Sequence, residues 1–395
     1  MTKINSTKHE NKPDLMRGYI EGYYGRLLTW NERGMILNHL SQLGMGYYLY
    51  APKEDPCHRF DWRQDYDQDW MTHFQSFCAE AKAGHVDVIA GVAPGIDFDF
   101  AHLGRGDDWN CLIQKCRALI TAGADQVALL LDDIQPDFDE KSGAFTNEAE
   151  AHAVLANTLN KALSDMMKKP LIMTPRIYAD EIMGHDLMAS GANDDVYWPK
   201  LAENLDAQIM LLVCGKNVVS HDTSLQDTAM IKAGISAGRA IIWDNLYAHD
   251  YCPRRLFLGP WKGRLDDQHI LLNPTGMTHT DMLLLSFMEA GDDQDGWHQA
   301  LSKHGVPEVF LKIAPFFDLP PRGEDDLAPP LDAEKMLAAL DMMLWQWKSP
   351  LQREWYPYLM GLRQDILLKT GQMNRLRARK SLPPLLWPDE SDEDV

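Results

Sequence analysis

Short apolar runs alternate with amphipathic patterns along the chain from Arg17 to about Ala290. Each run has the length of a strand that is buried on both faces, as in a parallel sheet. Between the runs, apolar residues recur at helical spacing, which predicts amphipathic helices. The predicted strands are Gly18–Gly22, Gly46–Tyr50, Val86–Val92, Val127–Leu131, Leu171–Thr174, Ile209–Val213, Ala240–Trp243 and Leu271–Asn273. Glycines at 44, 84, 123 and 238 are expected to end helices.

Eight strand–helix alternations over about 275 residues predict a (β/α)8 TIM barrel, a fold that typically needs roughly 250 residues. A doubly wound open sheet is the alternative, because it shows the same alternation. Such a sheet usually carries a glycine-rich phosphate turn after its first strand. The chain contains neither a GxGxxG nor a Walker A sequence. The barrel is therefore the favoured fold.

The pattern changes after about Gly296, where prolines punctuate helical segments. Two helices are expected there, over Ala333–Lys348 and Tyr356–Met373. The sequence thus divides into a polar lead (1–14), the barrel (15–295), a C-terminal helical appendage (296–386) and an acidic tail (387–395). The lead and the tail have the composition of disordered segments.

Composition excludes several classes of protein. Hydrophobic content of 45% and charged content of 24% describe an ordinary soluble globular chain. The net charge of -20 argues against nucleic acid or an anionic membrane as a partner, because both require a basic surface. No segment approaches roughly 18 uninterrupted apolar residues, so no membrane span is expected. The 6 cysteines are widely spread and form no CxxC pair, which fits a reduced cytoplasmic protein. The oligomeric state does not follow from the sequence.

Two adjacent aspartates, Asp132 and Asp133, follow the apolar run that ends at Leu131. In a barrel of parallel strands, active sites lie at the carboxyl ends of the strands. Carboxylates are costly to bury there unless they take part in chemistry. The pair could instead cap the next turn or helix, which is a common use of aspartate. This segment alone leaves both interpretations open.

Polar and aromatic residues also follow the other predicted strands. Carboxylates and amides can hydrogen-bond sugar hydroxyls, and tyrosine and tryptophan offer apolar rings to the sugar faces. Because the strand ends meet at one rim, these residues predict a carbohydrate pocket. They are Lys53, Tyr178, Trp243, Asn245, Asp250 and Asn273, and Gly22 lies beside Tyr23 at the end of the first strand.

Four segments in the same order resemble glycoside hydrolase family 84, the β-N-acetylglucosaminidases that include the protein O-GlcNAcases. The first segment, from Gly18 to Tyr66, contains EGYYG and YYLYAPKEDPCHRFDWRQDY. The others are LLLDDI at the aspartate pair, IIWDNLYAHDYCPRRLFLGPWKGR, and the later Leu272-Asn273-Pro274. Together they extend over nearly the whole predicted barrel.

The resemblance implies a role for each matching residue. Asp132 corresponds to the residue that polarises the 2-acetamido group of the substrate, and Asp133 to the general acid/base. Gly22 and Lys53 correspond to sugar-hydroxyl contacts. The remaining matches are Tyr178 near the reacting acetamido oxygen, Asn245 holding the acetamido or aspartate array, Asp250 binding the 4- and 6-hydroxyls, Asn273 on the same edge, and Trp243 lining the pocket.

Substrate-assisted glycosidases use the 2-acetamido oxygen, in place of an enzyme nucleophile, to attack the anomeric carbon. One ionised aspartate accepts the amide N–H, and a protonated aspartate donates to the leaving oxygen. Adjacent carboxylates repel each other, which raises the pKa of one and lowers the pKa of the other. One aspartate can then stay protonated while the other is ionised. The resemblance therefore implies a retaining exo-β-N-acetylglucosaminidase that acts on a terminal N-acetylglucosaminide of a protein Ser/Thr or a small glycan. No cofactor and no metal is expected.

Two alternatives remain at this point. One is a hexosaminidase, hyaluronidase-like in some cases, that acts on longer glycans. The other is a catalytically silent protein that binds N-acetylglucosamine. The intact pair of Asp132 and Asp133 argues against a silent binder, because binding alone does not need a strained acid pair.

Two segments depart from the family pattern. Val213-Cys214-Gly215 stands where Trp-Thr-Gly is usual, and Thr174-Pro175-Arg176-Ile177 precedes Tyr178 where a Thr-Glu pair is usual. Both flank the expected pocket, so they bear on leaving-group preference more than on the reaction. Cys214 would make the enzyme thiol-sensitive if it were reactive. A packed, inert cysteine is the interpretation that we favour.

Overall fold

The computed structural model describes residues 15–134, 138, 143, 145–183, 194–322 and 329–373. The predicted lead (1–14), the acidic tail (387–395) and the end of the appendage lie outside these residues. The chain forms two compact units. The first comprises Met1–Asp250 and Trp261–Asp292, and the second comprises Tyr251–Pro260 and Asp293–Val395. The second unit thus includes a short segment that the sequence-based division kept with the barrel.

Eight parallel strands close into a barrel in chain order, and β1 pairs with β8. The strands are β1 Arg17–Glu21, β2 Tyr47–Tyr50, β3 Asp87–Val92, β4 Gln126–Leu130, β5 Ile172–Thr174, β6 Met210–Val213, β7 Ala240–Asp244 and β8 His269–Leu272. Every predicted strand is present, and the closed order excludes the doubly wound open sheet. The predicted TIM barrel is confirmed.

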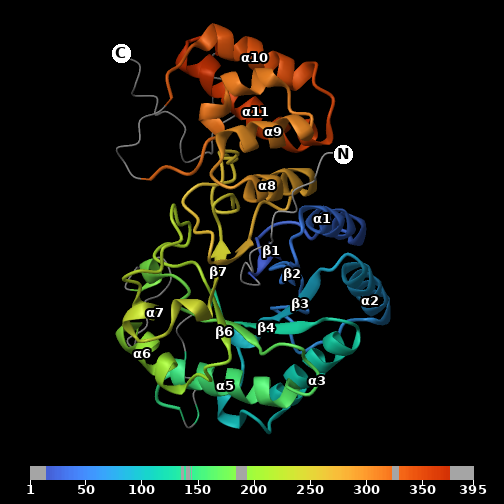
Figure 1. Cartoon of the computed structure of the whole chain (residues 1–395), viewed down its shortest axis with the longest axis vertical. Coiled ribbons are helices and arrows are strands. Elements are labelled where there is room, and N and C mark those ends of the chain that lie inside the picture. Colours follow the sequence, from blue (N-terminus) through green and yellow to red (C-terminus); the bar gives the residue numbers. More distant parts are fainter. Residues whose placement is uncertain are drawn as a thin grey trace, which may run out of the picture. The chain divides into compact units, whose positions relative to one another are not determined.

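Helices surround the strands of the first unit (Figure 1). They are α1 Trp30–Leu43, α2 Gln68–Ala83, α3 Asp107–Thr121, α5 Glu148–Leu163, α6 Asp194–Asn204, α7 Ala229–Lys232 and α8 Thr278–Ala290. Short 3-10 helices lie at Pro94–Ile96, Phe100–His102, Asp180–Ile182 and Ala237–Arg239. Helix α1 begins with a reciprocal capping box between Thr29 and Glu32, and it ends at Gly44 in the left-handed conformation.

One expected helix end is wrong. Gly238 lies inside the 3-10 helix that precedes β7, not at the end of a helix. The preceding helix, α7, is a single turn, and the chain turns after it at Gly234, which has a φ of 89°. Because α7 is short, the chain forms a 3-10 helix between α7 and β7. The positions of the glycines alone do not predict this 3-10 helix.

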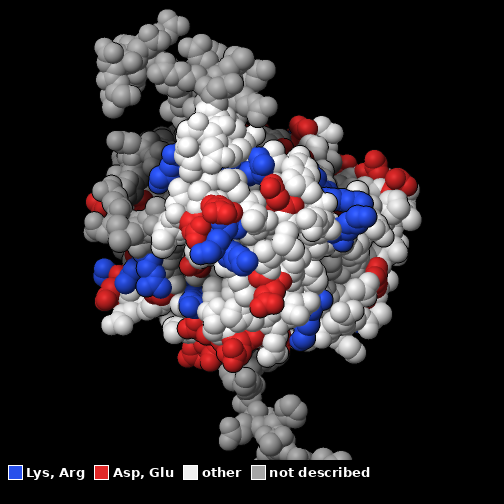
Figure 2. Space-filling model, turned by 90° about the horizontal axis from the view of Figure 1, so that it is seen from above, with Lys and Arg blue, Asp and Glu red and all other residues white. Residues whose placement is uncertain are grey.

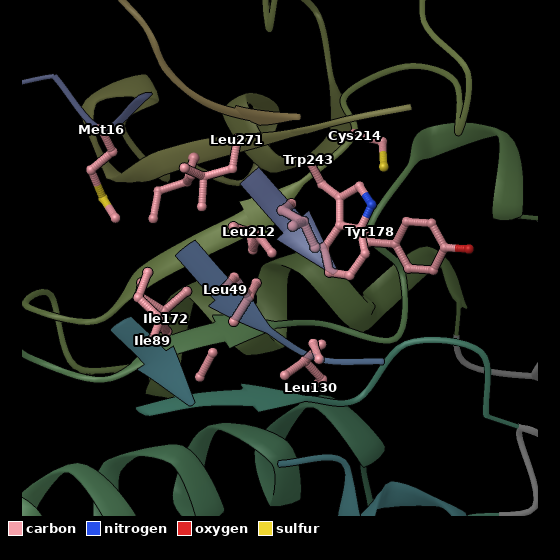
Figure 3. Packing of buried hydrophobic residues seen from close by; sticks show 14 of the residues in the cluster. Met16, Leu49, Ile89, Leu130, Ile172, Tyr178, Leu212, Cys214, Trp243 and Leu271 are labelled. Carbon is pink, nitrogen blue, oxygen red and sulfur yellow. The ribbon is translucent and has the colours of Figure 1, made fainter. Parts of the chain in front are cut away.

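Alternate residues of the strands point into the barrel and form its core. Figure 3 shows Met16 at one end of this core and Tyr178, Cys214 and Trp243 at the other. Leu130 of β4 and Leu271 of β8 belong to the core. Because side chains alternate, the residues two positions further on, Asp132 and Asn273, also point inward at the carboxyl ends of their strands.

The second unit is helical. Its helices are α9 Gln294–Lys303, α10 Ala333–Trp345 and α11 Pro350–Lys369, with 3-10 helices at Glu308–Lys312 and Ala314–Phe317. Trp355 is buried, and its ring centroid lies 5.4 Å from that of Phe310. Helix α11 begins at Pro350, well before the expected start at Tyr356. Ser349 caps it through the Leu351 N–H, and proline at the first helical position has no N–H to satisfy.

Acidic and basic side chains form small separate groups on the face seen in Figure 2. The described atoms of this face carry no continuous basic surface of the kind that polyanions require. Within the described ranges, no helix is both long enough and apolar enough to cross a membrane.

Candidate active site

Asp132 and Asp133 follow the end of β4 and direct both carboxylates to one place. Successive residues of an extended strand point to opposite faces. Asp133, however, has a φ of 53°, in the left-handed region that aspartate tolerates better than most residues. Lys53 Nζ contacts the Asp132 carboxylate and lies 3.8 Å from Asp133 Oδ2. The backbone turn at Asp133 thus accompanies the pairing of the two carboxylates.

Asp132 forms a buried ion pair through one oxygen only. Its side chain is 7% exposed, and that of Lys53 is 2% exposed. Lys53 donates to Oδ2, whereas the buried Oδ1 has no hydrogen-bond donor among the residues that the structure describes. Leaving a buried acceptor unsatisfied costs about 1–3 kcal/mol. Oδ1 is therefore ready to accept a hydrogen bond from a ligand.

Asp133 is held by two tyrosines, one on each oxygen. The Tyr178 hydroxyl donates to Oδ1 and the Tyr24 hydroxyl donates to Oδ2, both at 2.8 Å. Arg59 Nη2 donates to the Asp133 backbone carbonyl at 2.7 Å. Burial, and then the Asp133 charge, raise the pKa of both Tyr178 and Tyr24. Both phenols therefore keep their protons and act as donors.

A chain of hydrogen bonds joins the ends of β7, β8 and β1. Asn245 Oδ1 accepts from Trp243 Nε1 and from Asn273 Nδ2, each at 2.9 Å. Asn273 Oδ1 in turn accepts from the Gly22 N–H at 3.2 Å. The four residues were predicted separately, and the structure brings them together. These hydrogen bonds fix the position of the Trp243 ring.

Gly22 is required by the position of Trp243. A Cβ atom on residue 22 would lie 2.5 Å from Trp243 Cζ2. Lys53 Nζ lies 5.7 Å from the centre of the same indole ring, within the range of a cation–π contact. Gly22 and Lys53 therefore both lie against the Trp243 ring, and Lys53 also contacts Asp132.

Asp250 reaches the site from the loop that follows β7. Its Oδ2 accepts from the Tyr24 N–H at 3.0 Å. Tyr24 is also the residue whose hydroxyl contacts Asp133. One residue of the β1–α1 loop thus joins the two predicted carboxylates Asp250 and Asp133.

Two residues at the site, Tyr24 and Arg59, were not singled out from the sequence. Both lie inside the segment from Gly18 to Tyr66 that carried the family resemblance. Arg59 Nη1 donates to the Tyr24 hydroxyl at 3.1 Å. Their shared partner, Asp133, lies 109 residues from Tyr24 and 74 residues from Arg59 in the chain. Sequence spacing therefore gives no signal for these contacts.

Cys214 packs at the floor of the site. Its side chain is buried, and Sγ accepts from Asn245 Nδ2 at 3.5 Å. Burial raises the pKa of the thiol, so the reactive thiolate is disfavoured. These observations support a packed cysteine over a thiol-sensitive one.

Arg176, the other departure from the family pattern, belongs to a buried ionic network. Its Nε donates to both carboxylate oxygens of Glu148, at 2.8 and 2.7 Å, and its Nη2 contacts Asp194. The Arg176 N–H donates to the Tyr197 hydroxyl at 3.0 Å. Because Tyr178 lies only two residues further on, the network anchors the segment that supplies this tyrosine.

No cluster of three or more histidine, cysteine, aspartate or glutamate side chains is arranged to hold a metal ion within the described part of the chain. His58 is buried and contacts the Gly91 carbonyl through Nδ1 at 3.0 Å. Gly91 faces the barrel, so His58 fills space that a side chain at residue 91 would occupy.

Comparison with known proteins gives one family. A family model described as beta-N-acetylglucosaminidase matches residues 17–283. The chain is 27% identical over 263 residues to the protein O-GlcNAcase of Mus musculus, and equally so to that of Rattus norvegicus. Each alignment covers 65% of this chain and 28% of the relative. The chain thus matches less than a third of the length of these relatives.

Proposed function

The chain belongs to the β-N-acetylglucosaminidase family of glycoside hydrolases, and on that basis we propose that it removes a terminal β-linked N-acetylglucosamine by substrate-assisted catalysis. The match over residues 17–283 includes all the predicted site residues. The proposed machinery is Asp132 and Asp133, with Gly22, Lys53, Tyr178, Trp243, Asn245, Asp250 and Asn273 binding the sugar.

One observation carries the proposal: Asp132 Oδ1 is a buried acceptor that receives no hydrogen bond from any described residue, and it lies beside a second carboxylate. The N–H of a 2-acetamido group would supply the missing hydrogen bond. A hydrogen bond to a charged acceptor is worth about 1.5–3 kcal/mol, more than a neutral one. Because positive charge develops on the amide as its oxygen attacks, this bond strengthens in the transition state, which is the condition for catalysis.

In the first step, the acetamido oxygen forms a bond to the anomeric carbon as the bond from that carbon to the leaving oxygen breaks. Protonated Asp133 gives its proton to the leaving oxygen and becomes a carboxylate. Asp132 accepts the amide N–H and takes up that proton as the neutral oxazoline forms. The electron pair of the broken bond stays on the leaving oxygen, so the aglycone departs as an alcohol.

In the second step, the Asp133 carboxylate removes a proton from water, and the water oxygen bonds to the anomeric carbon. The oxazoline C–O bond breaks, and the nitrogen recovers its proton from Asp132. Both displacements occur on the same carbon with inversion, so the product retains the β configuration. The Tyr178 donor on Oδ1 stabilises the carboxylate form of Asp133 between the two steps.

The Lys53 ammonium group contacts the Asp132 carboxylate. Its second carboxylate neighbour, Asp133, lies 3.8 Å away. A bound sugar hydroxyl could therefore take one ammonium hydrogen while the remaining two stay directed at the aspartates. This arrangement accommodates the sugar-contact role that we propose for Lys53.

The proposed substrate is a terminal N-acetylglucosaminide on a protein serine or threonine, or on a small glycan. The first of these classes is supported by the mouse and rat relatives, which are named for action on protein O-GlcNAc. Trp243 and Asn273 are proposed to bind the sugar and not the leaving group, so they do not distinguish between the two aglycones.

Turnover of an aryl β-N-acetylglucosaminide tests the function, with Asp132→Asn as the inactive control. We expect hydrolysis by the native protein, and a rate lower by about two to three decades in the variant, the range for loss of one electrostatic partner of the transition state. Release from a glycopeptide and from a chito-oligosaccharide, measured side by side, then distinguishes the aglycones. A native protein that binds the sugar and releases no aryl alcohol would contradict the proposed reaction.

A further inference from the structure

Tyr24 covers the oxygen of Asp133 that faces the mouth of the site. Its hydroxyl donates to Oδ2 at 2.8 Å, while Oδ1 accepts from Tyr178 at the same distance. Tyr24 is 43% exposed, whereas Tyr178 is 9% exposed. Tyr24 thus lies on the solvent side of the carboxylate, and a leaving group arriving from solvent meets Tyr24 first.

Two further contacts hold Tyr24 in this position. Arg59 Nη1 donates to the Tyr24 hydroxyl at 3.1 Å, and the Tyr24 N–H donates to Asp250 Oδ2 at 3.0 Å. Because burial raises the pKa of Tyr24, its hydroxyl keeps the proton that it donates to Asp133. The Tyr24 hydroxyl therefore donates to Oδ2 when Asp133 is ionised. When Asp133 is protonated, the same hydroxyl would accept from the acid, as a glycosidic oxygen does.

Gly25, which follows Tyr24, has an unusual backbone conformation and open space beside it. Gly25 has a φ of 130°, which most side chains cannot adopt, and a Cβ atom there would have no neighbour within 4 Å. Capping contacts between Thr29 and Glu32 fix the far end of the loop at the start of α1. No described side chain therefore packs at residue 25, between Tyr24 and the start of α1.

We propose that Tyr24 is a displaceable cap on Asp133, which a leaving group must remove before it can receive the proton. This inference rests on the proposed function and extends it to the choice of leaving group. The Tyr24 hydroxyl contacts Asp133 Oδ2 at the position where the glycosidic oxygen of a substrate would bind.

The cap has a kinetic signature. Its hydrogen bond exists in the free enzyme and is absent from both the substrate complex and the transition state. Removing such a bond strengthens substrate binding and leaves the chemical step alone, so KM falls and kcat does not. Ligands without an aglycone never displace the cap, and their affinity stays the same.

Tyr24→Phe removes the hydroxyl and keeps the ring and the backbone contact with Asp250. Tyr178→Phe is the matched control, because it removes the other phenol from the same carboxylate. We would measure kcat and KM on an aryl and an alkyl N-acetylglucosaminide, and the Kd of a thiazoline mimic of the oxazoline, which has no aglycone. Tyr24→Phe should lower KM about two- to tenfold, the effect of one net hydrogen bond, with an unchanged Kd for the mimic. Tyr178→Phe should instead lower kcat.

An unchanged or raised KM in Tyr24→Phe, or a fall in kcat like that of Tyr178→Phe, would overturn the cap. So would an equal gain in affinity for the thiazoline. Tyr24→Leu, which also lacks the hydroxyl, should change KM in the same direction if the first variant proves unstable. If the native protein neither hydrolyses the glycosides nor binds the mimic, the proposed function fails and the cap fails with it. Native turnover with an unaltered variant removes only the cap.

Discussion

The Tyr178 hydroxyl lies 2.8 Å from Asp133 Oδ1, although 45 residues separate the two in the chain. Tyr178 follows β5 and Asp133 follows β4, and these strands are neighbours in the barrel. The other oxygen, Oδ2, accepts from the Tyr24 hydroxyl at the same distance. The two oxygens of the proposed acid therefore have different partners, one buried tyrosine and one exposed tyrosine.

Asp133→Asn should lower the rate most for substrates with poor leaving groups. A general acid matters most when the departing oxygen is basic, and its loss costs about two to four decades in rate. With an activated aryl leaving group the loss should be roughly one decade or less, because that oxygen leaves without full protonation. The measurement is kcat/KM over a series of leaving groups of different basicity. A loss that is the same across the series would show that Asp133 is not the acid.

Asp250→Ala should reduce transition-state binding without unfolding the protein. A carboxylate that receives two sugar hydroxyls makes charge-assisted hydrogen bonds of about 1.5–3 kcal/mol each. We expect a total loss of roughly 3–4 kcal/mol, or two to three decades in kcat/KM. Asp250→Asn, which keeps an acceptor for the Tyr24 N–H, should lose less. If Asp250 only stabilises the loop, the Ala variant would instead unfold at a lower temperature, and its folded fraction would keep the native kcat/KM.

Gly22→Ala should displace Trp243 and weaken sugar binding. The added methyl would lie 2.5 Å from Trp243 Cζ2, closer than real Cβ contacts. We expect KM to rise about tenfold or more, since the ring must move from the position that its bond to Asn245 fixes. Gly34→Ala is the control: it lies inside α1, its nearest added contact is the end of the Glu80 side chain at 3.5 Å, and alanine favours a helix. A native KM in Gly22→Ala would show that the indole does not bind the sugar.

His58 should make the fold sensitive to mild acid. Burial, and then the neighbouring Lys53, lower the pKa of His58 to about 4, against about 6.5 for an exposed histidine. The folded state therefore binds fewer protons than the unfolded chain between these values. The stability contributed by neutral His58 is complete above about pH 6.5 and is lost as the pH falls towards 4.

His58→Asn keeps an N–H donor for the Gly91 carbonyl and cannot titrate. From pH 7 to pH 4, the native protein should lose about 3 kcal/mol more free energy of unfolding than this variant. The other charged groups near His58, Asp55 and Arg59, are the same in both proteins. Denaturant unfolding at the two pH values measures the difference. Parallel losses in the two proteins would remove His58 as the cause.

The alternation of apolar strands and helices was enough to predict the barrel, because buried parallel strands leave a strong local signal. The strand ends then indicated where the polar residues meet. Strand periodicity could not predict that Asp132 and Asp133 face the same way. Their pairing accompanies a left-handed backbone at Asp133, which a sequence pattern does not reveal.

Contacts between loops were also beyond the reach of the sequence. Tyr24 and Arg59 lie in irregular segments, where neither helical nor strand spacing applies, and each meets Asp133 across a long stretch of chain. Arg176 looked like a simple departure from a family pattern. In the structure it is the centre of an ionic network with Glu148 at the start of α5 and Asp194 at the start of α6.

The central claim is that the acetamido oxygen of the substrate is the nucleophile, with Asp132 holding its N–H. The most direct measurement is kcat/KM on aryl N-acetylglucosaminides whose acetyl group carries zero, one, two or three fluorines. Each fluorine withdraws electrons and makes the amide oxygen a poorer nucleophile, while the leaving group stays the same. We predict a steep fall in kcat/KM along the series, by several decades in total if the oxygen attacks in the rate-limiting step. A rate that does not depend on the number of fluorines would contradict substrate assistance and require a nucleophile from the protein or from water.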